Sequence, residues 1–403
     1  MRFGYQLTEV GAIPESWGVA NLGECVRSDG PICYGILMPG QHVDGGVPVV
    51  KVRDILGGRV DESSLLLTHP SIDGAYKRSR LAPGDLLITI RGTTGRVALT
   101  SETLDRANIT QDTARVRVKS GVSGEFVYFA LQSDSAQQQI ALHTIGQAVK
   151  GINLRDVRRI AFPIPKQFSE QQTIAAALSD ADALLAGLDR LIAKKRDLKQ
   201  AAMQQLLTGQ TRLPGFHGEW EVTRLGDLLR FQVGFPFSSV HFNEKGIGIR
   251  LVKNRDLKSD DQLFHYSGNF DSEFVVHDGD VLVGMDGDFL PCKWNKGAAV
   301  LNQRVGRIVP KSGLNSEFSY YCLKEPLKAI EDITSSTTVK HLSHSDVEDI
   351  ERPLPGMPEQ AAIAAVLSDM DAELAALEAR RVKTRSLKQA MMQELLTGRT
   401  RLV

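Results

Sequence analysis

Two stretches of the chain space their apolar residues as a long amphipathic helix does. In the first, apolar side chains recur mostly every three or four residues from Ile174 through Leu185 to Leu198. The second repeats this spacing from Ile363 to Leu395. Because the spacing puts one apolar stripe along a helix, it predicts two helices of about 38 residues, each roughly 55 Å long.

The two stretches are near-copies of one another. Residues 170–209 return as residues 359–398, and both copies begin with Glu-Gln and end with Leu-Leu-Thr-Gly. Ser169 with Gln172 is typical of a capping box, and Gly209 and Gly398 are typical helix stops. A single stripe of this kind is as easily ordinary helical core, but two copies favour packing on each other as a coiled coil.

The residues before each helix have the pattern of a β-rich globular unit. In the first unit, Val47–Val52, Leu86–Ile90 and Asn108–Val118 predict strands, and Glu125–Gln139 predicts a helix. Pro163 and Pro165 close the unit before the long helix begins.

The second unit repeats this framework with different residues between the shared positions. Trp17 corresponds to Trp220, Lys51–Asp54 to Lys253–Asp256, Gly84–Leu87 to Gly279–Leu282, and Gln111 to Gln303. The sequence therefore predicts an α+β fold with two similar domains, residues 1–165 and 214–355. Two coiled-coil helices, in residues 166–213 and 356–403, separate the domains with pseudo-two-fold symmetry, and the family resemblance described below implies that they run antiparallel.

Composition favours a chain with globular cores. Of the 403 residues, 42% are hydrophobic, and no run of 18 apolar residues or N-terminal export signal is apparent, so we expect no membrane contact and a cytoplasmic location. The four cysteines form no Cys-x-x-Cys pair, which favours free thiols and leaves one disulfide as the lesser alternative.

The net charge of the chain does not indicate a nucleic-acid partner. The formal net charge is zero; residues 1–165 carry 18 Lys and Arg against 16 Asp and Glu, and residues 214–355 carry 16 against 21. Any affinity for DNA must then come from a local arrangement of cations or from the charge of a partner protein.

Motifs of common catalytic sites are missing. The sequence contains no phosphate-binding loop, dinucleotide-binding glycine motif, nucleophile elbow or zinc-protease motif, nor the tetrapeptide of amino-methyltransferases. His341, His344 and Asp346 are spaced too loosely for a metal site and read first as a polar loop. We expect no catalytic residue, no metal and no cofactor in this chain.

A Gly/Thr-rich segment, Arg91 to Arg96, is the most suggestive surface feature, although a plain turn would explain it equally well. Its counterpart in the second unit is Asp286-Gly287-Asp288-Phe289. Arginine donates to guanine O6 and N7, whereas aspartate accepts from cytosine N4. If the units bind DNA, these two tips are suited to different bases.

Further candidates for DNA contact are cations and polar residues near strand ends, for which solvated charge or ordinary packing is the competing interpretation. The full set of candidates is Lys51, Arg53, Arg91, Thr93, Thr94, Arg96, Lys150, Asn153, Lys253, Arg255, Asp286, Lys293, Trp294, Lys340 and His341. Lys194–Arg196 and the basic residues Arg380, Arg381 and Lys383 lie at matching places in the two helices. They suit a solvated face, DNA phosphates or a partner subunit.

The whole chain resembles the specificity subunits of Type I restriction-modification enzymes. The residues that carry the likeness are Gly4-Tyr5, Thr8–Gly11, Ile13–Trp17, Pro163–Pro165, Glu170-Gln171, Ile174-Ala175, Leu198–Gln200 and Leu206–Gly209. They occur in the family's order: recognition domain, long helix, second recognition domain, second long helix.

The resemblance implies a function as well as a fold. Such a subunit binds a two-part sequence in double-stranded DNA, one half per recognition domain, while antiparallel helices set the unread gap. It assembles with two methyltransferase subunits, which use S-adenosylmethionine to methylate adenine N6, and with restriction subunits that use ATP and Mg²⁺. Rods of roughly 55 Å suit half-sites about one helical turn apart.

Two other classes of function stay open on the sequence alone. The chain could be a coiled-coil scaffold whose globular units bind proteins, in which case no two-part DNA footprint is expected. It could also be an enzyme with an unrecognised site, for example a nuclease fused to a reader, in which case the isolated chain should cleave DNA with a metal.

Overall fold

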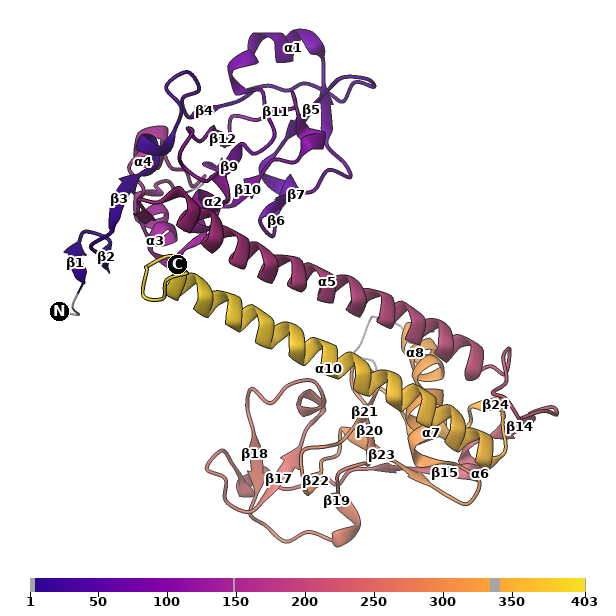
Figure 1. Ribbon diagram of the computed structural model, residues 1–403. Coiled ribbons are helices and arrows are strands. Elements are labelled where there is room, and N and C mark those ends of the chain that lie inside the picture. Colours follow the sequence, from indigo (N-terminus) through magenta and orange to yellow (C-terminus); the bar gives the residue numbers. More distant parts are fainter. Residues whose placement is uncertain (1–3, 148, 334–340, 403) are drawn as a thin grey trace. The chain divides into compact units, whose positions relative to one another are not determined.

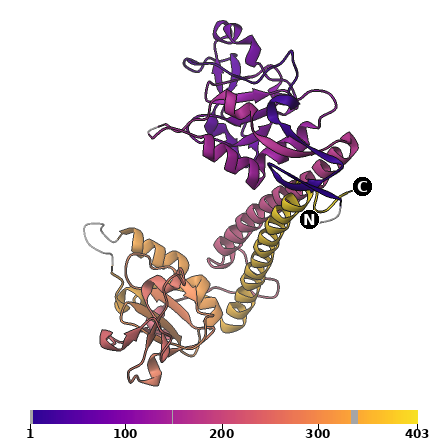
Figure 2. The same cartoon turned by 90° about the vertical axis from the view of Figure 1, so that its left-hand side faces the viewer.

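The computed structural model describes residues 4–147, 149–333 and 341–402. The chain forms two compact units (Figures 1 and 2). Unit 1 comprises residues 1–189 and 379–403, and unit 2 comprises residues 190–378. Each unit combines β-sheets with short helices and with part of both long helices, so the chain mixes helix and strand as predicted.

The two long helices are α5 (Phe168–Leu206) and α10 (Met357–Leu395), each of 39 residues. Gly209 and Gly398 follow them with φ of +72° and +70°, the left-handed conformation that ends a helix, so the predicted stops are confirmed. The predicted capping box is wrong, because α5 begins at Phe168 and Ser169 already lies inside it.

In unit 1 the first part of α5 packs antiparallel to the last part of α10. Ile174 and Leu178 share one buried core with Leu395. Lys388 Nζ donates to Asp182 Oδ1 at 2.6 Å, and Arg381 lies 3.1 Å from Asp189. The partner's number falls as the number along α5 rises, which is the order of an antiparallel pair.

In unit 2 the remaining parts of these helices pair in the same order. Leu206 and Leu207 pack in the core that contains Ile363 and Leu367. Ion pairs join the two helices in this unit: Lys195 with Glu373, Arg196 with Glu378, and Lys199 with Asp371. Lys195, Arg196 and, in unit 1, Arg381 thus already have carboxylate partners, which disfavours a DNA role for these three cations.

The strands of unit 1 form one four-stranded sheet, one three-stranded sheet and three pairs. They are β1 Tyr5–Thr8, β2 Gly11–Pro14, β3 Trp17–Asn21, β4 Cys33–Tyr34, β5 Val47–Val50, β6 Ile55–Leu56, β7 Arg59–Val60, β8 Leu66–Thr68, β9 Leu86–Thr89, β10 Val97–Leu99, β11 Asn108–Ile109, β12 Thr113–Val116 and β13 Ala161–Pro165. Its short helices are α1 Pro70–Ala75, α2 Gly124–Gln132, α3 Asp134–His143 and α4 Leu154–Arg158, with 3-10 turns η1 Leu22–Cys25, η2 Val52–Asp54, η3 Lys77–Ser79 and η4 Glu102–Leu104.

Unit 2 repeats the arrangement with a four-stranded sheet, a five-stranded sheet and one pair. Its strands are β14 Glu221–Arg224, β15 Leu229–Val233, β16 Phe242–Asn243, β17 Ile249–Val252, β18 Phe264–Tyr266, β19 Val275–Val276, β20 Val281–Gly284, β21 Pro291–Lys293, β22 Ala299–Leu301, β23 Val305–Pro310 and β24 Glu351–Leu354. Its helices are α6 Leu225–Leu228, α7 Ser316–Cys322, α8 Lys324–Ile333 and α9 His344–Glu348, with 3-10 turns η5 Ser239–His241, η6 Asn254–Leu257 and η7 Ser272–Phe274.

The main sheets of the two units have the same strand order. Unit 1 has β10-β9-β12-β4, all antiparallel, and unit 2 has β21-β20-β23-β15. In each unit the central strand is buried on both faces. In β9, Leu86 and Ile88 face one core and Leu87 faces another, which explains the run of three apolar residues at its start.

Two predicted elements of unit 1 are interrupted. The strand expected over Asn108–Val118 is two strands, β11 and β12, which belong to different sheets and are joined by residues 110–112. The helix expected over Glu125–Gln139 breaks at Ser133, whose hydroxyl accepts from the amide of Ala136 and caps α3.

A buried carboxylate anchors the start of each long helix. In unit 1, Glu170 is 3% exposed and accepts two bonds of 2.8 Å from Arg401 and one of 3.3 Å from the indole of Trp17. Arg401 follows the end of α10 and Trp17 begins β3. The carboxylate thus ties together three segments that are distant in sequence, and the hydrogen bond to Glu170 raises the pKa of Arg401.

Unit 2 contains the same contact. Glu359 accepts two bonds of 2.5 Å from Arg212, which follows the end of α5, and one of 3.2 Å from the indole of Trp220. The neighbouring glutamines, Gln171 and Gln360, are buried and bond to the backbone of their own units. The repeated Glu-Gln pair is therefore an anchor for the helix start.

The chain ends of unit 1 meet at this anchor. The hydroxyl of Tyr5 donates to the carbonyl of Gly398 at 2.9 Å, and Figure 2 shows the N-terminal strands beside the end of α10. A Cβ on Gly398 would lie 2.6 Å from the ring of Pro14, so this position requires glycine for space as well as for backbone conformation. In the described part of the chain, no helix has the length and apolarity needed to cross a membrane, and the four cysteines are free.

We expect Glu170→Ala to destabilise unit 1 by about 2 kcal/mol, because the buried indole of Trp17 loses its acceptor and Arg401 loses its carboxylate. Urea denaturation measures the change. Glu15→Ala, which removes an exposed glutamate two residues before Trp17, is the matched control and should leave stability within about 0.5 kcal/mol. Equal stabilities of the two variants would contradict an anchoring role.

Candidate nucleic-acid interface

In unit 1 the segment after β9 is held by its backbone. The amide of Arg91 donates to the carbonyl of Asp112 at 3.2 Å, and the amide of Gly92 donates to the carbonyl of Lys150 at 2.9 Å. Arg91 also forms an antiparallel bridge with Gly151. These bonds involve only backbone atoms, so the tip keeps its shape whatever side chain occupies position 91.

The tip borders a cavity of about 570 Å³ in which four of the predicted residues meet. The lining consists of Val52, Arg53, Leu56, Arg91, Gly92, Thr93, Arg96, Asp112 and Val149. Three arginines face one acidic residue here, so the cavity favours an anion or the acceptor edge of a base.

The predicted residues at the tip differ in their freedom to bind. Arg91, Thr93 and Arg53 are exposed, and the guanidinium of Arg53 lies 3.5 Å from the carboxylate of the neighbouring Asp54. Arg96 is half-buried and donates to the carbonyl of Val52 at 3.3 Å and that of Ile55 at 3.1 Å, so it links the tip to η2.

Three other candidates of unit 1 serve the local structure. Thr94 is half-buried, and its hydroxyl lies 3.1 Å from that of Thr144. The backbone amide of Lys51 donates to the buried carboxylate of Asp54 at 2.8 Å. This bond does not involve the side-chain ammonium of Lys51. Asn153 accepts from the amide of Asp156 at 3.0 Å and caps α4.

Lys150 is exposed and adjoins the tip through its carbonyl. Among the candidates of unit 1, the exposed cations at the tip are therefore Arg53, Arg91 and Lys150.

Unit 2 presents an acidic tip at the corresponding backbone position. Asp286 forms an antiparallel bridge with His341, as Arg91 does with Gly151. Its Oδ1 lies 3.0 Å from His341 Nδ1 and 3.6 Å from the guanidinium of Arg304. The side-chain amide of Asn254 donates to the carbonyl of Asp286 at 2.7 Å and joins the tip to η6.

The charges of the two tips are inverted. Arg91 in unit 1 is replaced by Asp286 in unit 2, and Asp112, whose carbonyl accepts from the amide of Ile90, is replaced by Arg304, whose carbonyl accepts from that of Met285. The prediction missed Asp112 and Arg304. The correspondence of Gln111 with Gln303 places them one residue later, so the signal was present in the sequence.

Lys253 and Arg255 gather on one aromatic ring. Lys253 Nζ lies 3.3 Å from the ring centre of Phe264 and the guanidinium of Arg255 lies 5.0 Å from it. Burial lowers the pKa of Lys253, and the charge of Arg255 lowers it further. Both cations thus have an internal partner, which is a different setting from the open tip of unit 1.

Two candidates of unit 2 are corrected. Trp294 is 1% exposed, and its indole donates to the carbonyl of Gly297 at 2.6 Å, so it is a core residue that cannot stack on a base. Lys293 is bound by Glu317 and lies 3.4 Å from the hydroxyl of Tyr321, so it stabilises the contact with α7. Lys340 lies outside the described residues.

No cluster suited to a metal ion occurs among residues 4–147, 149–333 and 341–402. In the polar loop, Asp346 accepts from the amide of Ser343 at 2.8 Å and Ser343 caps α9, which begins at His344. His341 instead faces Asp286.

Comparison with known proteins identifies the two units. The family model of the Type I restriction modification DNA specificity domain matches residues 41–194 and 217–384. The chain is 35% identical to the Type I restriction enzyme EcoBI specificity subunit of Escherichia coli over 192 residues, which is 46% of this chain and 40% of that protein. It is 23% identical to the putative MjaX specificity subunit of Methanocaldococcus jannaschii over 98% of this chain and 96% of the relative.

Solved structures share the fold. The specificity subunit from M. genitalium superposes with a TM-score of 0.64 at 15% identity and covers 94% of this chain and 96% of its own. A chain from a study of complex assembly and conformational transition in a Type I restriction-modification system has a TM-score of 0.56 at 20% identity, covering 96% and 99%. The chain therefore belongs to the family of Type I restriction-modification specificity subunits.

Proposed function

We propose that this chain is the non-catalytic subunit that chooses the DNA sequence for a Type I restriction-modification complex. Each recognition domain reads one half of a two-part target in double-stranded DNA. The observation that carries the proposal is the pair of tips with one backbone geometry and inverted charge. Two domains of the same fold, one with a hydrogen-bond donor at its tip and the other with an acceptor, can distinguish two different half-sites.

The tip chemistry suggests how each half-site is distinguished. In unit 1, the exposed guanidinium of Arg91 can donate two parallel hydrogen bonds to guanine O6 and N7, with Thr93 beside it. In unit 2, Asp286 can accept from cytosine N4, while Arg304 and His341 restrain its carboxylate. The exposed Arg53 and Lys150 are suited to phosphate contacts that set position and not sequence.

The long helices set the gap between half-sites in this proposal. We assign residues 1–165 and 214–355 to recognition and residues 166–213 and 356–403 to an antiparallel coiled coil with pseudo-two-fold symmetry. Support comes from the antiparallel pairing of α5 with α10 inside each unit and from the repeated glutamate anchor. A helix of 39 residues spans roughly 58 Å, which exceeds the roughly 35 Å of one DNA turn, so half-sites about one turn apart lie within its length.

Catalysis belongs to partner subunits. Two methyltransferase subunits would bring S-adenosylmethionine and methylate adenine N6, and restriction subunits would bring ATP and Mg²⁺, all in the cytoplasm. The formal charge of zero supports this division, because a chain without excess cations gains DNA affinity from its partners.

The first test is to express the chain with methyltransferase subunits from its own cell and to map N6-methyladenine in the host DNA. We expect one motif made of two short specific halves separated by a fixed, unread gap. A map without new methylation, or with one uninterrupted motif, would refute the proposal. The same map separates a DNA reader from a protein-binding scaffold, which would add no motif.

The second test changes one tip at a time in the complex with the methyltransferase subunits. Arg91→Ala should relax one base of one half-site and slow methylation of the original target roughly tenfold or more, because a bidentate contact to guanine is lost. Asp286→Asn should act on the other half-site only.

Lys119→Ala removes an exposed cation of unit 1 that lines no part of the tip cavity, and it should leave the motif unchanged. If Arg91→Ala altered both halves equally, or neither, the assignment of one tip to one half-site would be wrong.

A further inference from the structure

A second cavity of unit 1, of about 650 Å³, is separate from the tip and more basic. It lies between β4, η3, β12 and α4. Six cations line it, with Asp29 as the acidic residue of the lining: Lys77, Arg78, Arg80, Arg115, Arg117 and Arg158.

Two of these cations are neutralised inside the unit. Arg80 pairs with the buried Asp73, and Arg117 donates to Asp85 at 2.8 and 2.6 Å. The acidic Asp29 is itself held by Arg27, at 2.7 Å. In the described part of the chain, the other four lining cations have no ion pair, so the cavity carries an uncompensated positive charge.

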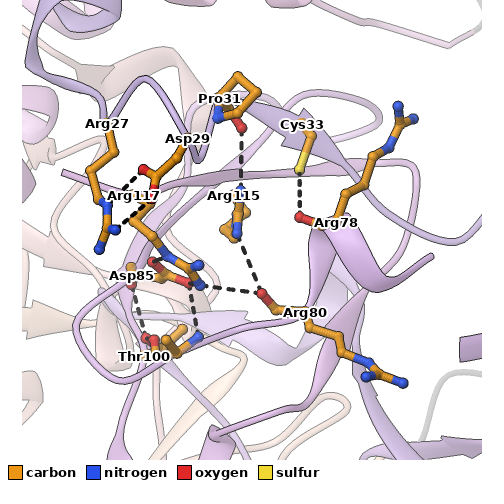
Figure 3. A network of polar contacts seen from close by, with 11 residues as sticks. Arg27, Asp29, Pro31, Cys33, Arg78, Arg80, Asp85, Thr100, Arg115 and Arg117 are labelled. Carbon is orange, nitrogen blue, oxygen red and sulfur yellow. Dashed lines mark hydrogen bonds and ion pairs between the residues drawn. The ribbon is translucent and has the colours of Figure 1, made fainter. Parts of the chain in front are cut away.

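Arg115 is the unusual member of this set. It is 4% exposed, and Figure 3 shows its guanidinium between the carbonyls of Pro31 and Arg80, at 3.3 and 3.5 Å. Its Nε has no hydrogen-bond partner among the described residues. A buried charge without a counter-charge is costly, so a bound anion would satisfy this side chain.

The equivalent arginine of unit 2 shows what is missing. By strand register Arg307 corresponds to Arg115, because each lies opposite the matching leucine, Leu282 or Leu87, of the central strand. Arg307 donates to Gln232 at 3.1 and 2.5 Å and to Asp280 at 3.3 Å.

In unit 1 the counterparts of these two side-chain acceptors are not available to Arg115. Cys33 stands opposite Arg115 where Gln232 stands opposite Arg307, and its thiol bonds to the carbonyl of Arg78. Asp85, the counterpart of Asp280, is taken by Arg117. Both arginines also donate to backbone carbonyls, but Arg115 has neither of the side-chain acceptors that Arg307 has.

We propose that this cavity binds a phosphate of the DNA backbone, with Arg115 at its base and Lys77, Arg78 and Arg158 at its rim. The proposal rests on the function inferred above. A guanidinium matches the geometry of phosphate oxygens, and its charge strengthens the bond. Arg115 alone would be enough to bind one free anion. The three exposed rim cations can in addition bind the adjacent phosphates of a continuous DNA strand.

The test uses the complex with methyltransferase subunits and the duplex that carries its mapped target. Because Arg115 is buried and its replacement could disturb folding, the main variants are the exposed Arg78→Gln and Arg158→Gln. Each should weaken binding to target and non-target duplexes by the same factor, roughly tenfold, and lower the salt slope of log Kd by about one. Arg159→Gln, the exposed neighbour of Arg158 outside the cavity lining, is the matched control and should change neither.

Ethylation interference locates the contact. One phosphate should be found whose ethylation weakens binding of the unmodified complex but no longer weakens binding of Arg78→Gln or Arg158→Gln. Identical interference patterns for the unmodified complex and the two variants would overturn the inference. The two-part target, and hence the proposed function, would remain intact.

A free anion as the true ligand is distinguishable. Inorganic phosphate would then raise the Tm of the unmodified chain but not of Arg158→Gln, while DNA binding of the two stayed equal. That result would overturn the assignment to DNA. Loss of the two-part target in the unmodified complex would instead refute the proposed function.

Discussion

The hydrogen bonds of a buried carboxylate are the interaction on which each unit depends. Glu170 and Glu359 each pair with an arginine that follows the end of the other long helix, and each accepts a tryptophan indole, from Trp17 at the start of β3 or from Trp220 just before β14. A buried carboxylate is stable only if its donors are in place. The helix start, the sheet and the helix end must therefore form together, which explains why Glu-Gln, Trp and Thr-Arg-Leu occur in both halves of the sequence.

This anchoring leaves the side chains of the two tips free to vary. The strand that leads to each tip is buried on both faces, and the tip itself is held by amide-to-carbonyl bonds that do not depend on the side chain. Position 91 can be arginine while its counterpart, position 286, is aspartate, at no cost to the backbone. Separating the residues that fold the unit from those at its surface is how one fold can present two different surfaces.

Sequence patterns predicted the long helices, their glycine stops and the central strand at Leu86–Ile90, because period and turn chemistry are local. They did not show that Ser133 starts a new helix inside a helical pattern, since capping serines also occur within helices. Nor did they show that the side chain of Trp294 is buried, because the sequence Lys293-Trp294 at a strand end fits a buried or an exposed tryptophan equally well. Asp112 and Arg304 were accessible from the repeat, but the isolation of Arg115 depends on which acid its neighbour Arg117 occupies, and only the three-dimensional structure supplies that.

The same dependence explains why net charge is a poor guide to this chain. Many of its cations form ion pairs within the chain. Lys195, Arg196 and Lys199 pair with carboxylates across the two long helices in unit 2, and Arg381 and Lys388 do so in unit 1. Such pairs contribute little stability each at the surface, yet they remove their cations from competition for a polyanion. Cations without an ion pair remain available to a polyanion, and in unit 1 several of them line the tip cavity and the Arg115 cavity. A neutral sequence can thus present a locally positive surface.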